Sequence, residues 1–280
     1  MSKLFILATD YTRKLSGVLT KLDIMRKAFP NSDIVYGYNP SANDGNIDTV
    51  KESCRMSGIN YNNDVVIPSA LTAYKGQIQT GYLYYFDIME KFLQTDSDYL
   101  IFMESDYYPI KKDVEQFFVT ECDKIPGWDM AAFVHPQDIN GLLQYNQPMI
   151  DLWKKWMGRD DGWIQVYGYC VALSRRGVQY IIDEIHTDYC TQFLSLMNQI
   201  PTAPVSLWLI ETLFPCIMQK HGANIVPYPS YAFTVFDHAT FETLFNDPAM
   251  YFIHGVRDDH KMPYFGCSDD LNKIYEYWAG

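Results

Sequence analysis

The chain has 280 residues, of which 48% are hydrophobic, so it can bury a core without a metal or a disulfide to hold it together. Its 22 Lys and Arg against 34 Asp and Glu give a net charge of -12. So acidic a chain gains nothing from counterion release on nucleic acid and is repelled by anionic lipid. We therefore expect neither as a partner.

The chain also lacks the sequence signals of a secreted or membrane protein. Its apolar runs are far shorter than the ~20 residues that span a bilayer, and Met1 leads directly into a predicted strand without a signal peptide. The six cysteines are scattered, without a Cys-x-x-Cys pair, which favours reduced thiols. We expect a soluble, cytoplasmic protein of unknown oligomeric state.

Strands and helices alternate in the first 110 residues. Apolar runs predict strands at 3–8, 33–38, 64–68 and 99–103. Apolar residues at helical spacing predict helices at 15–29, 48–56 and 75–93, of which the last is the clearest. This alternation predicts an α/β fold whose mostly parallel sheet has right-handed crossovers, a Rossmann-like nucleotide-binding half.

The pattern is looser after residue 110. It predicts helices at 114–120 and 147–157, and strands at 130–134 and 163–173. Ser174 is expected to cap a helix to about 185, and Ser206 one to 221–222 with a kink at Pro215. Late strands are predicted at 225–226 and 250–253. With no linker in sight, we expect a single domain, 1–280, with a nucleotide half (1–110) and an acceptor half (111–280).

The stretch 98–109, DYLIFMESDYYP, is the most informative about function. Its apolar strand ends in Glu104 and Asp106, separated only by Ser105, and Pro109 is expected to close the turn. Ligands of open α/β sheets bind outside the carboxyl ends of the strands. Two carboxylates spaced i, i+2 there can hold one hard divalent cation and leave positions for phosphate. An ordinary turn or helix start also favours acids, so the rest of the chain must decide.

The Glu104–Asp106 pair resembles the Asp-x-Asp motif of metal-dependent GT-A glycosyltransferases, with Glu in the first position. In that family the acids hold Mn²⁺ or Mg²⁺ against the diphosphate of a nucleotide sugar. The resemblance implies a GT-A fold, which is a mostly parallel central sheet flanked by helices with an acceptor-side subdomain. It also places Glu104 and Ser105 beside the donor.

The resemblance extends to the donor side, in the family's chain order. The end of the first strand, Thr9, Asp10 and Tyr11, is similar to the uridine-binding strand end of GT-A enzymes. Lys75 and Gln79, at the start of the long helix, look like its donor-contacting helix. An ordinary strand-to-helix turn, and a solvated lysine, are the alternatives.

On the acceptor side, the aromatic, Gly-bent segment 162–176 resembles the element that follows the metal motif in this family. Glu211 lies in an otherwise apolar helix, where a charge is costly unless it is paired or useful. In inverting members a carboxylate from this region deprotonates the acceptor hydroxyl. The alternative is that Glu211 is a surface glutamate or is paired with a cation. Asp138 and Asp237 are weaker candidates for the base. A retaining enzyme needs no such base.

Residues 251–263 resemble the His…Gly…Lys-Pro element of several GT-A families. The resemblance implies that His254 completes the metal sphere and that Lys261 contacts the diphosphate. The match is imperfect, because Gly255 follows His254 directly and the gap to Lys261 differs from the family's.

These features predict a metal-dependent glycosyltransferase that moves a sugar from a UDP-sugar to a hydroxyl of a glycan or glycoconjugate, with inversion. A sugar-1-phosphate nucleotidyltransferase is the first alternative, but residues 9–13 lack the glycines of its usual loop after the first strand. A non-enzymatic carbohydrate-binding protein that uses an aromatic surface is the second, and the 22 tyrosines of the chain suit it.

Overall fold

The fold is described from a computed structural model of the whole chain. The described residues are 2–10, 15–38, 47–62, 78–104, 106–134, 151–159, 162, 164, 166–197, 209–227, 232–234, 237–256 and 268–280. Within them the chain forms two compact units. The first comprises residues 1–63, 102–126 and 229–280, and the second comprises 64–101 and 127–228. The predicted division into nucleotide and acceptor halves is a functional one and stays a prediction.

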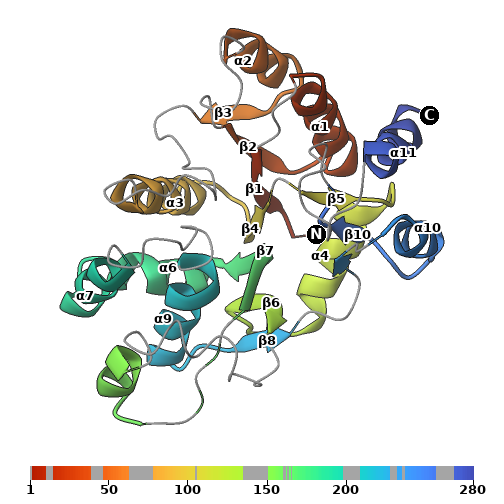
Figure 1. Cartoon of the computed structure of the whole chain (residues 1–280). Helices are drawn as coiled ribbons and strands as arrows, with labels where there is room; N and C mark the ends of the chain where they lie inside the picture. The colour runs from red at the N-terminus through yellow and green to blue at the C-terminus, as the bar shows by residue number, and fades with distance from the viewer. Residues whose placement is uncertain are drawn as a thin grey trace. The chain divides into compact units, whose positions relative to one another are not determined.

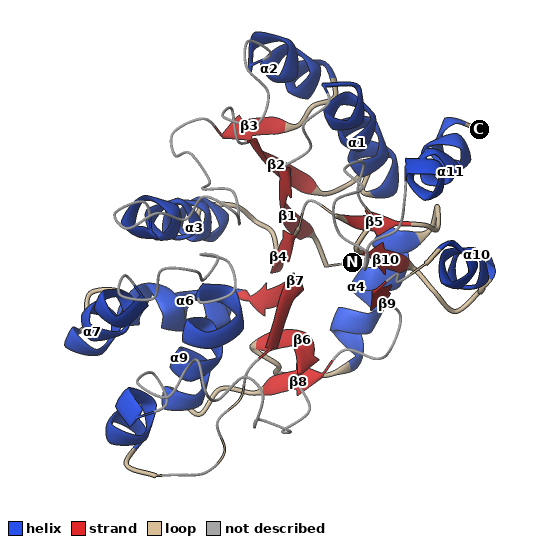
Figure 2. Cartoon of the chain, viewed as in Figure 1, coloured by secondary structure: helices blue, strands red, loops and turns tan. Residues whose placement is uncertain are grey.

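Seven strands form one mostly parallel sheet in the order β3-β2-β1-β4-β7-β6-β8. The strand β4 spans Tyr99–Met103, and its residues are divided between the two units. The pairs β1–β2, β2–β3 and β6–β8 are parallel, whereas β6 and β7 are antiparallel. With helices beside the sheet in Figure 2, this is the α/β class predicted from the sequence.

The first unit contains three parallel strands, a small three-stranded sheet and five helices among the described residues. Its elements are β1 (Leu4–Asp10), α1 (Leu15–Ala28), β2 (Asp33–Tyr38), α2 (Ile47–Met56), β3 (Asn60–Asn62), β5 (Tyr107–Pro109), α4 (Val114–Lys124), β9 (Ala232–Thr234), α10 (His238–Asn246), β10 (Phe252–His254) and α11 (Ser268–Ala279). The strand β1 is buried along its apolar run, and α1 packs against α2, α11 and β5. The Phe118 ring of α4 contacts the Phe252 ring of β10, and Figure 1 labels α4, β5 and β10 in this unit.

The second unit contains the other end of the sheet and most of the remaining helices. Its elements are α3 (Ile78–Leu93), β6 (Met130–Val134), β7 (Val166–Ser174), α6 (Arg175–Glu184), α7 (Asp188–Met197), the π-helical turn η2 (Leu209–Leu213), α9 (Phe214–Lys220) and β8 (Ile225–Pro227), with a further helical stretch at 151–157. The helix α6 packs against α3 and α9, and Ser174 caps it as predicted, accepting a hydrogen bond from the Gly177 amide.

One local expectation was wrong. Pro109 does not close a turn, because residues 107–109 form β5, which pairs with the distant strand β10. The kink at Pro215 stays a prediction. At this place the helix changes type, because η2 ends at Leu213 and α9 begins at Phe214. The strand predicted at 64–68 lies outside the described residues. Among the described residues, no helix has both the length and the apolar character needed to cross a bilayer.

Candidate metal centre

The two carboxylates singled out in the sequence lie where β4 ends. The strand β4 is buried, and Glu104 is the first residue beyond it. The Tyr107 amide donates to the Glu104 carbonyl (3.3 Å), so the chain turns tightly between the two acids before β5 begins. This turn keeps both carboxylates close to the end of β4.

The pairing of β5 with β10 brings the third member, His254, to the same place. The antiparallel register sets His254 opposite Tyr107, the residue after Asp106. The Gly255 amide donates to the Asp106 carbonyl (2.9 Å), and the Phe252 ring stacks on the Tyr107 ring. Gly255 has a φ of 85°, a conformation that favours glycine, which explains why glycine follows His254 directly.

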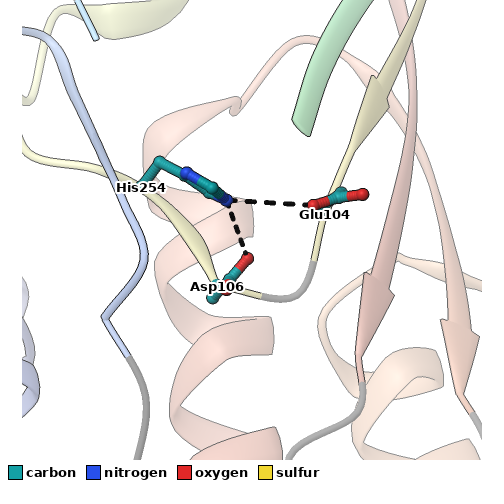
Figure 3. A group of neighbouring side chains, drawn as sticks. All are labelled: Glu104, Asp106 and His254. Atoms are coloured by element: carbon teal, nitrogen blue, oxygen red, sulfur yellow. Dashed lines mark ion pairs between the residues drawn. The ribbon is translucent and has the colours of Figure 1, made fainter. Parts of the chain in front are cut away.

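The three side chains converge on a common point (Figure 3). The His254 Nε2 atom lies 3.3 Å from Asp106 Oδ1 and 3.8 Å from Glu104 Oε2. Asp106 is almost fully buried at 3% exposure, His254 is 14% exposed, and Glu104 is the most open at 27%. The cluster is therefore anchored inside the protein on one side and accessible on the other.

The donor set fits a divalent cation. Two cis ligands with bonds near 2.1–2.2 Å are separated by about 3.0–3.8 Å, depending on the angle at the metal. The two measured distances, 3.3 and 3.8 Å, fall in this range. The two carboxylates suit Mn²⁺ or Mg²⁺, the imidazole is more typical of transition metals, and three protein ligands leave positions for substrate oxygens. The same contacts also form when a protonated His254 pairs with the acids.

Sequence reasoning missed a buried lysine, Lys21, that contacts the ends of β1 and β4 next to this site. Lys21, in α1, is 0% exposed, and its Nζ donates to the carbonyls of Thr9 (3.3 Å) and Glu104 (3.2 Å). The signal was present, because Lys21 interrupts the helical apolar stripe that contains Val18 and Met25. A cation in such a stripe is costly unless it has partners.

The predicted donor contacts are described only in part. Thr9 is buried, and its hydroxyl donates to the Met103 carbonyl (3.4 Å), so this side chain links the ends of β1 and β4. Asp10 is the last residue of β1, and Gln79 lies in the first turn of α3; only their backbone is described. The other four predicted residues, Tyr11, Lys75, Ser105 and Lys261, lie outside the described residues.

The proposed base, Glu211, lies in the second unit, in the π-helical turn η2, and is 6% exposed. A π-turn is rare and is frequently found at functional sites. Of the weaker candidates, Asp138 is outside the described residues. Asp237 has a structural role, because its carboxylate accepts a hydrogen bond from the Thr240 amide and caps α10.

The chain is similar to solved structures but not to any known sequence family. No protein-family model and no curated protein sequence matches the chain. Among solved structures, the galactosyltransferase LgtC in complex with donor and acceptor sugar analogues is similar at 12% identity, with a TM-score of 0.50 over 99% of this chain and 95% of that one. The bifunctional glycosyltransferase WbbM, in its apo form, is similar at 13% identity with a TM-score of 0.51. That match covers 98% of this chain and 49% of WbbM.

The sheet order and the strand-end cluster define an α/β protein with a candidate metal centre. The similarity to LgtC and to about half of WbbM identifies a more specific class: the chain has a GT-A-like glycosyltransferase fold. The fold predicted from the sequence is thereby confirmed. At 12–13% identity the likeness establishes the fold alone, so the activity has to be argued from the site.

Proposed function

We propose that the chain is a divalent-metal-dependent glycosyltransferase that moves a sugar from a UDP-sugar to a hydroxyl of a glycan or glycoconjugate. The observation that carries this proposal is the convergence of Glu104, Asp106 and His254 at the end of β4, in a chain with a glycosyltransferase fold. LgtC was solved with donor and acceptor sugar analogues, which supports the same two kinds of substrate here.

The three side chains differ in burial. Asp106 and His254, the more buried pair, and the more exposed Glu104 would together hold a divalent cation. A bound Mn²⁺ or Mg²⁺ would supply positive charge that stabilises the departing diphosphate. Thr9 and Asp10, at the end of β1, hold the uracil together with Tyr11. Lys75, Gln79, Ser105 and Lys261 contact the rest of the donor.

Glu211 takes the proton of the acceptor hydroxyl in a single displacement, so the product has the inverted anomeric configuration. Its place in the π-helical turn η2 supports this role, because π-helical turns are frequently found at functional sites. Replacing it in Glu211→Gln should leave UDP binding intact and stop transfer. The matched control is Glu90→Gln, an exposed glutamate of the same unit. Continued transfer, or a product of retained configuration, removes the base role from Glu211.

Ligand-dependent stability tests the metal centre directly. Thermal unfolding should be followed with UDP alone, Mn²⁺ alone and both together, since a ligand that binds only the folded state stabilises it by about 2.7 kcal/mol at one hundred times its dissociation constant. We expect a rise with UDP that depends on Mn²⁺. Asp106→Asn should abolish it, whereas Asp23→Asn, at an exposed aspartate of the same unit, should not.

The outcomes separate the alternatives. An unchanged response in Asp106→Asn refutes the metal assignment and favours a protonated His254 ion pair. Release of UDP from a UDP-sugar supports a transferase, whereas release of pyrophosphate from UTP and a sugar-1-phosphate identifies a nucleotidyltransferase. Stabilisation by free sugars, with no response to any nucleotide, favours a carbohydrate-binding protein.

A further inference from the structure

The buried ammonium of Lys21 contacts several of the segments that build the metal centre. Its Nζ donates to the carbonyl of Thr9, at the end of β1, and to the carbonyl of Glu104, just beyond β4. It also lies 5.1 Å from the centroid of the Tyr108 ring in β5, within range of a cation–π interaction. Tyr108 is in turn paired with Ile253 in β10, next to His254.

The three members of the cluster are not held equally. Asp106 and His254 are fixed by the β5–β10 register and by the hydrogen bond from the Gly255 amide to the Asp106 carbonyl. Glu104 lies outside that small sheet. Its carbonyl accepts hydrogen bonds from the Tyr107 amide at 3.3 Å and from the Lys21 ammonium at 3.2 Å. Its carboxylate is also the more distant from His254, at 3.8 Å.

We infer that Lys21 is a positioning residue of the metal centre, whose buried ammonium fixes the ends of β1 and β4 and so sets where Glu104 lies relative to Asp106 and His254. This inference rests on the proposed function, since it assumes that the three side chains hold a cation. Groups that orient metal ligands in this way typically change metal affinity by about 10- to 100-fold when they are removed.

The sign of the effect separates positioning from simple electrostatics. A lysine ammonium near a cation site repels the cation, so removing its charge should tighten metal binding if charge were its only influence. Positioning predicts the opposite, because a displaced Glu104 contributes less to the site. A role confined to stability predicts no change in metal affinity in protein that is still folded.

The test is a Mn²⁺ titration of the full chain without nucleotide, with free Mn²⁺ measured by electron paramagnetic resonance. The variants are Lys21→Met, which keeps the aliphatic stem and removes the donors, and Lys21→Gln, which keeps a shorter neutral donor. The matched control is Lys27→Met on the same helix, where the side chain is 42% exposed and its ammonium pairs with Asp23. Circular dichroism at the titration temperature selects the variants that are folded.

We expect Mn²⁺ affinity to fall at least about tenfold in Lys21→Met, to fall less in Lys21→Gln, and to stay unchanged in Lys27→Met. Should Lys21→Met fail to fold, the direction of the change in Lys21→Gln decides. Affinity that is unchanged or higher in a folded Lys21 variant overturns the inference and leaves the proposed function standing. A wild-type chain that binds no Mn²⁺ overturns both.

Discussion

Replacing Gly177 with alanine tests how closely the first turn of α6 packs against the backbone at Asp129. A Cβ at this position would lie 2.3 Å from the carbonyl oxygen of Asp129, roughly 1 Å inside ordinary contact distance. That oxygen already accepts a hydrogen bond from the Ser174 amide (3.0 Å). The Asp129 carboxylate is held by Arg176 (2.6 and 3.0 Å) and by the Asn224 amide (2.9 Å). The backbone that must move is therefore fixed from several directions.

The cost follows from two opposing effects. Overpacking a fixed site typically costs 1–3 kcal/mol, and the rigidity around Asp129 puts Gly177→Ala near the upper end, at about 3 kcal/mol. Alanine recovers about 1 kcal/mol, because it is a better helix former than glycine. We therefore expect the free energy of unfolding to fall by about 2 kcal/mol.

Equilibrium unfolding in urea, followed by tryptophan fluorescence, measures this change as a lower midpoint at an unchanged slope. Gln179→Ala is the matched control, because Gln179 is exposed on the same helix and its loss should change stability by no more than about 0.5 kcal/mol. If Gly177→Ala is as stable as the wild type, the close approach of α6 to Asp129 is wrong.

Three further predictions test other parts of the chain. Ser174→Ala removes the cap of α6 and should lower the free energy of unfolding by about 1 kcal/mol; no loss in urea unfolding contradicts the cap. His254→Ala removes a proposed ligand and should weaken Mn²⁺ binding by more than about tenfold, and an unchanged titration removes His254 from the centre. The pKa of His238 is raised by its hydrogen bond to the buried Asp270 carboxylate and then by the charge of that group. Protonated His238 therefore stabilises the fold below the ordinary histidine pKa near 6.5, and this contribution is lost as pH rises through the raised value. His238→Gln should flatten that loss in unfolding experiments from pH 6 to 9, and parallel wild-type and variant curves refute it.

The long apolar elements could be predicted from the sequence because their period and their burial coincide. The strand β2 and the strand β6 have the predicted bounds, 33–38 and 130–134, and α1 ends within a residue of its predicted end at 29. In these segments local preference and tertiary packing agree. The helix α11 was missed although Leu271, Ile274 and Trp278 recur at helical spacing and are buried, so its signal was present in the sequence.

The short strands could not be predicted in the same way. The strands β5 and β9 have three residues each and exist because both pair with β10, which is distant in sequence from β5. A three-residue segment carries too little periodicity to identify it as a strand. The π-turn at 209–213 likewise depends on packing, and only Pro215 indicated an irregularity there.

The candidate site also has features that could be predicted from the sequence and features that could not. The candidate residues could be identified, because carboxylates after a buried strand and a histidine before a glycine have direct chemical meanings. Their convergence could not be predicted, because it depends on the pairing of β5 with β10, which are far apart in the sequence. Resemblance to a family supplied the link between Asp106 and His254 that local pattern alone lacks.

This dependence on register has a thermodynamic consequence. A slip of one residue between β5 and β10 would turn the His254 side chain to the opposite face and leave the acids without their imidazole. The stacked Phe252 and Tyr107 rings and the Gly255 hydrogen bond to Asp106 hold the register. Because these contacts join segments far apart in the chain, the three side chains meet only when the first unit is folded. A cation held by all three would therefore stabilise the folded state, and a short peptide carrying residues 98–109 should lack the affinity of the intact chain.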